Sequence, residues 1–288
     1  MRRGEKRGPG PGAGRGARRA PGRRGLPSTV VGIVLLAVML FPVYWMVNTS
    51  LQPAGGIVRG DWFPAAPDLG GYATALRDQG GHLVTSLVVS LGSVALSLGL
   101  AAPAAYGLTL LRARRIRLVL LGVLVTQMVP GIVVADTLYG AYAELGLLNS
   151  SPGLVLADST AGVPFAIVVL HTFMRTIPRE IVEAARMDGA GRLRVFRSVV
   201  LPLSVNALVT AGVFTFLFTW GDFLFALTLT TSGPVRPITL GVYDYLGAHT
   251  GQWNAVMATA VLASVPAALL LVVAQRFVTS GATRGADR

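Results

Sequence analysis

Long stretches without a charged residue constrain this chain more than any other feature. Its 288 residues include 25 basic and 13 acidic ones, and six charge-free stretches are longer than 15 residues. They cover residues 25–58, 79–111, 118–135, 159–174, 198–221 and 245–275. A helix that crosses the roughly 30 Å hydrocarbon core of a bilayer needs about 20 mostly apolar residues. We therefore expect an all-α membrane protein with six transmembrane helices, the fourth of which extends back across Asp158.

The basic residues are divided unequally among the segments that connect these stretches. If the amino terminus is inside, the inner segments hold 22 of the 25 basic residues and the outer segments hold three. The inner segments are residues 1–27, 112–117, 175–201 and 276–288. Because Lys and Arg resist translocation, this division predicts a multi-pass protein of the cell (inner or plasma) membrane with both termini in the cytoplasm.

The two ends of the chain are expected to lie outside the transmembrane domain, which spans residues 28–277. Residues 1–27 contain nine basic residues, eight glycines and four prolines. Such a composition cannot bury a core, so we expect a disordered basic tail held near anionic lipid. Residues 278–288 form a second cytoplasmic tail. A scaffold that binds nucleic acid or lipid through the basic tail is a weaker alternative, and no nucleic-acid partner is expected.

Several chemistries are excluded by residue type. The chain has no cysteine, and its single lysine is Lys6, so it contains no Walker A sequence. We therefore expect no catalytic residue, no metal site and no cofactor in this chain. Asp136, Asp158 and Asp222 are expected near the outer boundary, which leaves no ionisable side chain at mid-depth. Carriers driven by ion gradients place such groups there, so a partner is the expected energy source. An ion-coupled carrier or channel of six helices remains the alternative.

Two groups of residues are candidates for a translocation path. Gln127 lies near the middle of the third span, with Pro130 just outward, and it either hydrogen-bonds to a neighbouring helix at a kink or lines a polar path. Trp220, Asp222 and Phe223 lie near the outer boundary. They are expected either in the interfacial belt or in contact with substrate.

The inner segment 175–201 predicts two short amphipathic helices joined at Gly189 and held against the membrane surface. The first helix has acidic residues in its first turn, and Gly189 suits the positive φ that ends a helix. In the second helix Leu193, Phe196 and Val200 form one stripe, and the fifth span starts at Pro202. Ala184 and Ala185 form a thin face that suits either docking to a partner or a plain surface loop.

The same segment carries a motif with defined spacing. Glu183, Ala184 and Ala185 are followed after three residues by Gly189, and after nine more by Val199, Leu201 and Pro202. This arrangement resembles the EAA motif of binding-protein-dependent ABC importer permeases, with valine in place of the usual isoleucine. Further stretches resemble the carbohydrate-importer subfamily, the maltose and glycerol-phosphate type. They are TSLQ (49–52), LGGY (69–72), TSLVVSLGS (85–93), AAYG (104–107), QMVPG (127–131), LGLLNS (145–150), PF (164–165), IPREIVEAARMDGA (177–190) and WGDF (220–223).

The resemblance implies a type I ABC importer permease that forms half of a path for a sugar or related carbohydrate. A second, related permease subunit, two copies of a separate ATP-binding subunit that holds ATP and Mg²⁺, and an extracytoplasmic solute-binding protein are the implied partners. The inner segment would be a coupling helix in a cleft of the ATPase subunit, with Asp188, Arg192 and Phe196 holding its two helices together. The implied coupling residues are Glu183, Ala184, Ala185, Asp188, Gly189, Phe196, Leu201 and Pro202.

Overall fold

The computed structural model describes residues 26–53, 62–64, 66–248 and 252–282, and every regular element among them is a helix. The chain divides into two units, residues 1–44 and 45–288. Residues 1–25 of the expected basic tail and the last six residues lie outside the described part. The first helix, α1, begins at Leu26, and the last, α12, ends at Ala282.

Helix α1 (Leu26–Ser50) contributes its first part to the first unit. Residues 28–44 are apolar around the whole helix and exposed, as expected of a helix that faces lipid or a partner. The last turn of α1 belongs to the second unit, where Asn48, Thr49 and Ser50 are buried. There the Ser50 hydroxyl lies 2.7 Å from the Tyr72 hydroxyl.

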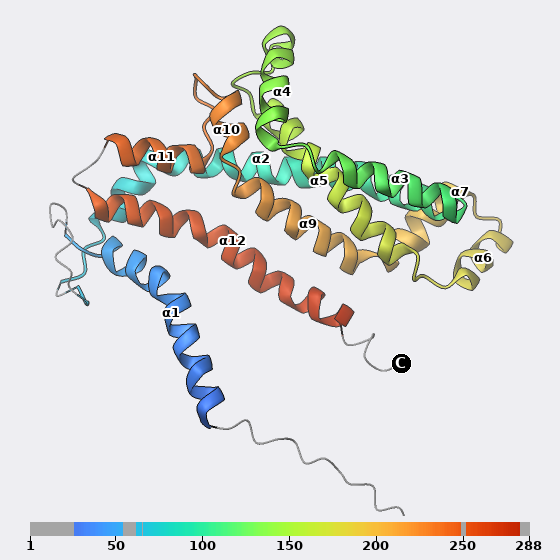
Figure 1. Ribbon diagram of the computed structural model, residues 1–288, viewed down its shortest axis with the longest axis horizontal. Helices are drawn as coiled ribbons and strands as arrows, with labels where there is room; N and C mark the ends of the chain where they lie inside the picture. Colours follow the sequence, from blue (N-terminus) through green and yellow to red (C-terminus); the bar gives the residue numbers. More distant parts are fainter. Residues whose placement is uncertain (1–25, 54–61, 65, 249–251, 283–288) are drawn as a thin grey trace, which may run out of the picture. The chain divides into compact units, whose positions relative to one another are not determined.

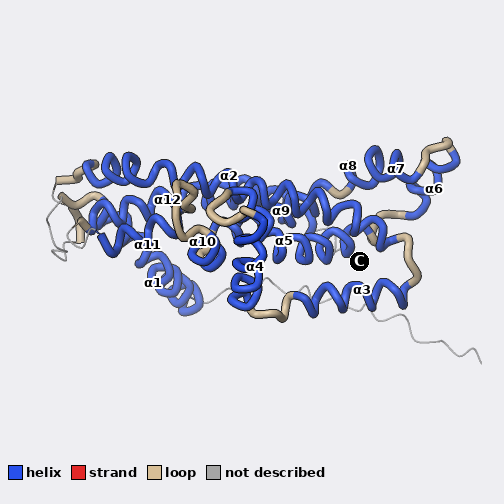
Figure 2. The backbone as a smooth tube through the Cα atoms, turned by 90° about the horizontal axis from the view of Figure 1, so that it is seen from above, coloured by secondary structure: helices blue, strands red, loops and turns tan. Residues whose placement is uncertain are grey.

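Four long helices form the bundle of the second unit (Figures 1 and 2). They are α2 (Gly70–Thr109), α5 (Ser151–Met174), α9 (Val205–Trp220) and α12 (Trp253–Ala282). With 40 residues, α2 is about 60 Å long, more than a bilayer requires. Helix α2 begins at Gly70, nine residues before the charge-free stretch 79–111, and its first turns bury Ala75 and Gln79 against the bundle.

Small residues let α2, α5 and α9 approach one another closely. Most of the buried residues of α2 between positions 86 and 105 are serine or alanine, among them Ser86, Ser90, Ser93, Ser97, Ala101 and Ala105. At Gly162 of α5, an added Cβ would lie 2.5 Å from the Ser97 Oγ atom and 2.9 Å from the Thr215 Cγ2 atom. Backbones in contact over small side chains are typical of helix packing within membranes.

Within the described residues, four helices are long and apolar enough to cross a membrane, and the number of candidate spans is six when each of two bent pairs counts as one span. The expected third span is such a pair, α3 (Ala113–Thr126) and α4 (Gly131–Leu145), bent by 83°. The bend lies at residues 127–130, where Pro130 supplies no backbone N–H. Helix α4 continues to Leu145, ten residues beyond the charge-free stretch that ends at residue 135, and only residues 146–150 connect it to α5.

Helix α5 begins earlier than expected because Ser150 caps it. The Ser150 Oγ atom accepts a hydrogen bond from the Gly153 N–H (3.1 Å), and Pro152 stands in the first turn. Asp158 is therefore the eighth residue of the helix, about 10 Å from its start, and 1% exposed. The expectation that Asp158 opens this span at the outer boundary is wrong. The chain does carry an ionisable side chain within a span.

Short helices complete the second unit. They are α6 (Arg179–Met187), α7 (Arg192–Val195), the π-helical turn η1 (Phe196–Val200), α8 (Leu201–Leu203), α10 (Leu224–Leu229) and α11 (Ile238–Ala248). Helix α10 packs on α4. Asn149 joins the two regions, since its N–H donates to the Leu229 carbonyl (2.9 Å) and its side-chain oxygen accepts from the Ser232 N–H (2.8 Å).

Replacing Gly162 by alanine tests the close approach of α2, α5 and α9. The added methyl group meets Ser97 and Thr215, so we expect a loss of about 1–3 kcal/mol in stability, seen as a lower thermal unfolding midpoint in detergent. The control is Gly99→Ala in α2, where no atom lies within 4 Å of the added Cβ. Equal midpoints for the two variants would contradict the packing described.

Candidate coupling site

Helix α6 has well-defined ends. It starts directly after Pro178, with Glu180 in its first turn, and stops at Gly189, whose φ is +82°. The Gly189 N–H donates to the Arg186 carbonyl and the Ala190 N–H to the Ala185 carbonyl, both at 3.0 Å. This pair of bonds is the Schellman motif, which requires the left-handed conformation that glycine adopts readily. The predicted helix stop at Gly189 is confirmed.

The outward face of α6 combines a carboxylate with small and flexible side chains. Glu183 and Ala184 are exposed, and Met187 is 84% exposed. Val182 and Ala185 turn the other way and pack against the core at this end of the bundle. Adjacent helical residues point about 100° apart, so the face that was expected to show both alanines shows only Ala184.

The second half of the loop is anchored in the bundle. Val195 and Val200 are 0% and 2% exposed and join a core cluster with Leu170 of α5. The Phe196 ring stacks on Tyr106 of α2, with ring centroids 5.3 Å apart and planes 27° from parallel. The predicted stripe of Leu193, Phe196 and Val200 is therefore wrong at Leu193, which is 61% exposed.

Phe196 thus holds the loop to α2, and it packs against the same core cluster as Val182 and Ala185 of α6. Asp188 and Arg192, which were expected to help join the two short helices, form no ion pair in the described part of the chain. Sequence reasoning missed Tyr106, although it stands in the AAYG stretch. Nothing local marks a tyrosine as the partner of a residue 90 positions later.

The end of the motif forms the break before α9. Pro202 lies within α8, and the segment Arg192–Leu203 meets α9 at 75°. At the break the Ser204 N–H donates to the carbonyls of Val200 (3.0 Å) and Leu201 (3.1 Å). Helix α9 therefore begins at Val205, three residues after Pro202. Leu201 and Pro202 form the rigid corner through which the loop joins α9.

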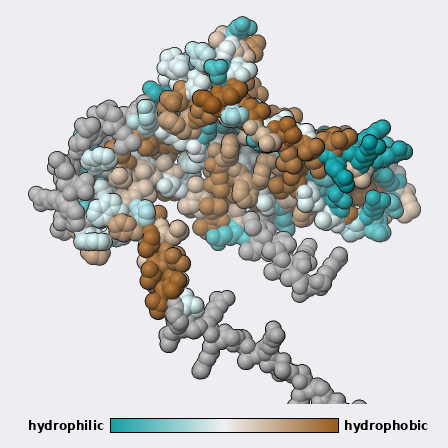
Figure 3. Space-filling model, viewed as in Figure 1, coloured by the Kyte–Doolittle hydropathy of each residue, from teal (hydrophilic) through white to brown (hydrophobic). Residues whose placement is uncertain are grey.

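Charge collects at the same end of the unit. Figure 3 shows hydrophilic residues gathered over the end that carries α6 and α7, while apolar residues cover the middle of the bundle. The exposed arginines of this end come from the loop itself and from the segment between α2 and α3 with the first turns of α3, and they are Arg112, Arg114, Arg115, Arg117, Arg175, Arg179, Arg186, Arg192, Arg194 and Arg197. This distribution matches a surface that meets water rather than lipid.

The candidates for a translocation path lie elsewhere in the unit. Trp220 was considered for the interfacial belt, but it is only 7% exposed. It stacks on Phe216, with ring centroids 5.4 Å apart, and its Nε1–H donates to the Ala263 carbonyl (3.0 Å). Trp220 and Phe223 line an open, mostly apolar groove of about 520 Å³ with residues of α11 and α12. The Phe223 ring packs on Tyr243.

Asp222 serves as the cap of α10. Its carboxylate accepts hydrogen bonds from the N–H groups of Ala226 (3.1 Å) and Phe225 (3.4 Å), and its carbonyl accepts from the Thr239 hydroxyl (2.7 Å). Gln127 and Pro130 are exposed at the α3–α4 bend. An added Cβ on Gly131, the residue after Pro130, would lie 3.2 Å from Leu224, so the bend adjoins the start of α10.

The family model described as "Binding-protein-dependent transport system inner membrane component" matches residues 95–284. The match covers the whole coupling loop and most of the bundle. The chain belongs to this family. It is a permease subunit of an ABC importer, a non-enzymatic protein that crosses the membrane several times.

Curated relatives resemble this permease along nearly its entire length. The sulfoquinovosyl glycerol transport system permease protein SmoH of Agrobacterium fabrum is 33% identical over 260 residues, which are 89% of this chain and 91% of the relative. The trehalose transport system permease protein SugB of Mycobacterium tuberculosis is 31% identical and covers 94% and 98% of the two chains. The diacetylchitobiose uptake system permease protein DasC of Streptomyces coelicolor is 30% identical.

Solved structures share the fold. A chain of a bacterial ABC transporter involved in the import of the acidic polysaccharide alginate superposes with a TM-score of 0.75 and 21% identity. The match covers 88% of this permease and 95% of that chain. A chain of the MetNI methionine ABC transporter in an inward-facing conformation gives a TM-score of 0.54. The expected fold class, a type I ABC importer permease, is confirmed.

Gly189→Ala should loosen the carboxyl end of α6. A non-glycine residue in the left-handed region costs about 1–2 kcal/mol, so the last turn of the helix opens more often. We expect trypsin to cut after Arg186 in membrane preparations up to about tenfold faster than in the native permease. Gly191→Ala is the matched control, because Gly191 has a φ of −67° and open space around it. Equal cleavage rates for the two variants would argue against the role assigned to Gly189.

Proposed function

We propose that this permease is one of two transmembrane subunits of an ATP-driven carbohydrate importer, and that α6 is the helix that couples it to a separate ATPase subunit. The observation that carries the proposal is the contrast within the coupling loop. Helix α6 projects Glu183, Ala184 and Met187 outward, while α7 and η1 are fixed to α2 and α5 by Val195, Phe196 and Val200. A force applied to α6 would therefore reach the long helices.

The face of α6 suits a groove in another protein. Ala184 leaves room for close approach, Met187 adapts its shape to an apolar pocket, and Glu183 offers a carboxylate to a basic residue. Closure of two ATPase subunits around ATP and Mg²⁺ would move α6 and tilt the spans between inward-open and outward-open states. The permease itself holds no ATP in this proposal.

Carbohydrate is the proposed cargo because the relatives with more than 30% identity include permeases for sulfoquinovosyl glycerol and for trehalose. A related fold occurs in a bacterial alginate ABC transporter in complex with an alginate pentasaccharide-bound periplasmic protein. By analogy, a soluble binding protein would deliver the solute to the outer side. A second permease subunit of related sequence would complete the path.

The groove beside Trp220 and Phe223 is the proposed part of the path in this subunit. Phe223 presents a partly exposed ring there, and Thr239 and Ser264 supply hydroxyl groups. Rings beside a few polar groups are typical of sites for small polar ligands. Gln127 and Pro130, at the α3–α4 bend, are assigned to the same path because this bend adjoins the start of α10.

An ion-coupled carrier of six helices is the alternative. The sequence argued against a carrier because the spans were expected to contain no ionisable side chain, and the buried Asp158 removes that argument. Membership of the importer family is now the reason to disfavour a carrier. The two functions differ in a reconstitution experiment. Vesicles that contain only this permease should take up no sugar under a Na⁺ or H⁺ gradient, and uptake by the lone chain would refute the proposal.

Glu183→Lys is expected to separate the permease from its ATPase. The substitution places a cation against the basic residue proposed to bind Glu183, so co-purification of the ATPase should fall about tenfold or more, and uptake with it. Glu144→Lys, an exposed Glu to Lys change in α4, is the control and should leave both intact. Normal ATPase recruitment and uptake by Glu183→Lys would contradict the assignment.

The proposed orientation has a direct test because the native chain contains no cysteine. Single cysteines at Ala66 and Ala113 fall in the proposed outer and inner connections, and both positions are exposed. A membrane-impermeant maleimide should label Ala66→Cys in intact cells and Ala113→Cys only after permeabilisation. The cysteine-free parent gives the background, and the reverse labelling pattern would place the coupling loop outside.

A further inference from the structure

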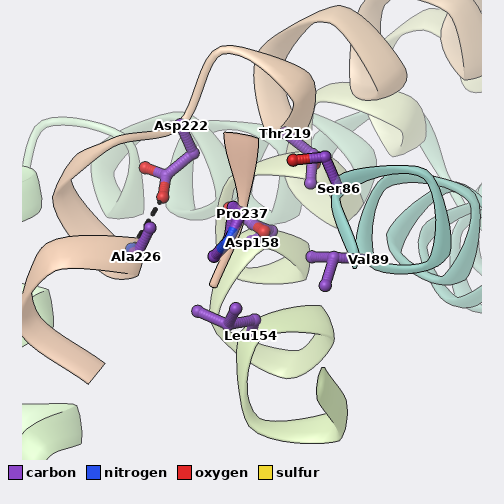
Figure 4. A pocket seen from close by; sticks show the side chains of 8 residues that line it. All are labelled: Ser86, Val89, Leu154, Asp158, Thr219, Asp222, Ala226 and Pro237. Carbon is purple, nitrogen blue, oxygen red and sulfur yellow. Dashed lines mark hydrogen bonds between the residues drawn. The ribbon is translucent and has the colours of Figure 1, made fainter. Parts of the chain in front are cut away.

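A small cavity inside the second unit is lined by two carboxylates that the coupling mechanism does not use. They belong to Asp158 in α5 and Asp222 between α9 and α10, and Figure 4 shows both at the cavity. The cavity volume is about 10 Å³, which is room for one water molecule or one bare ion. The other lining residues are Ser86, Val89, Leu154, Thr219, Ala226 and Pro237.

The two carboxylates differ in their partners. The Asp222 carboxylate accepts hydrogen bonds from two backbone N–H groups of α10, which stabilise its negative charge. The Asp158 side chain is 1% exposed, and its Oδ1 atom has no hydrogen-bond partner among the described residues. Neither carboxylate forms an ion pair with a described basic residue. Asp158 and Asp222 therefore share one cavity without a basic partner among the described residues.

A third oxygen at the cavity is also unpartnered. Thr219 is 6% exposed, and within the described part of the chain its Oγ1 atom has no hydrogen-bond partner. Thr219 is one of the residues that line the cavity (Figure 4). Threonine hydroxyls in helices commonly bond to a carbonyl of the preceding turn, as Thr215 does to Ala211. The Thr219 hydroxyl is thus left free to serve as a ligand.

These features select the chemistry of an occupant. A buried carboxylate without a partner is costly, so the cavity favours a positive charge. Its polar lining is all oxygen, which suits hard cations. Because α10 compensates the charge of Asp222, about one negative charge remains to be neutralised. Mg²⁺ would keep several waters and Ca²⁺ would take six to eight ligands, and a cavity for a single small sphere provides neither.

We propose that this cavity binds one sodium ion, held by the side-chain oxygens of Asp158 and Thr219, with Asp222 and Ser86 completing the ligand set. Ser86 belongs to α2, and its Oγ atom already accepts from the Ile238 N–H of α11 (2.8 Å). The ion would therefore join α2, α5, α9 and the turn before α10. Since Asp158 is enclosed, the ion is retained as a structural element and is not transported.

The experiment measures the thermal unfolding midpoint of the purified full-length permease by tryptophan fluorescence, for which Trp220 lies next to Thr219. Na⁺ is varied from about 1 to about 300 mM, with N-methylglucamine holding the ionic strength constant. We expect the midpoint to rise by about 3–6 °C, because a ligand of the folded state stabilises it by mass action. In Asp158→Asn this dependence on Na⁺ should disappear, whatever the absolute midpoint of the variant.

Two further variants make the test specific. Thr219→Val keeps the shape of the side chain and removes one ligand, so half-saturation should require about tenfold more Na⁺. Asp136→Asn neutralises an exposed carboxylate of α4 and should respond to Na⁺ as the native chain does. A native midpoint that ignores Na⁺ but follows pH would show that Asp158 holds a proton and would overturn the proposal. An unchanged Na⁺ response in Asp158→Asn would overturn it as well.

Discussion

The close packing of α2 against α5 and α9 is the constraint on which the rest of the second unit depends. A face of serine and alanine on α2 meets Gly162 of α5, where even one added methyl group would reach Ser97 and Thr215. In lipid, helices gain little from hiding apolar side chains from one another, so backbone proximity has to supply the contact. Because α2 is about 60 Å long, this one contact face reaches both ends of the bundle.

At one end, α2 holds the coupling loop. Phe196 stacks on Tyr106, and Val195 and Val200 pack in the neighbouring core. The loop is therefore joined to the long helices that would have to tilt during transport. Helix α6 shares little of this burial and keeps its outward face free. A rigid base combined with an exposed short helix is the arrangement that a coupling element requires, because a flexible base would absorb the movement. The corner at Leu201 and Pro202 passes that rigidity on to α9.

Toward the other end, α2 contributes Ser86 to the cavity that contains Asp158 and Asp222. Here the bundle encloses negative charge instead of apolar surface. A bound sodium ion would neutralise that charge. It would also hold in place the turn between α9 and α10, which lies beside the groove of Trp220 and Phe223. The two ends would then have complementary tasks, one receiving force and the other maintaining the shape of the solute path. The small-residue face of α2 connects them.

The sequence by itself determined the class of protein, the helix stop at Gly189 and the family. The length of the charge-free stretches indicates the class, a glycine that suits a positive φ indicates the helix stop, and the spacing of the motif indicates the family. Each of these signals depends only on residues near one another in the chain. Tertiary structure alone decided the start of α2, the bend at Gln127 and Pro130, the choice of Val195 over Leu193 as the anchor, and the burial of Asp158. Each of these depends on which distant helix lies opposite. Phe196 packs on Tyr106, which is 90 positions away in the sequence, and Asp158 shares a cavity with Asp222, which is 64 positions away. No local sequence pattern predicts contacts between residues so far apart.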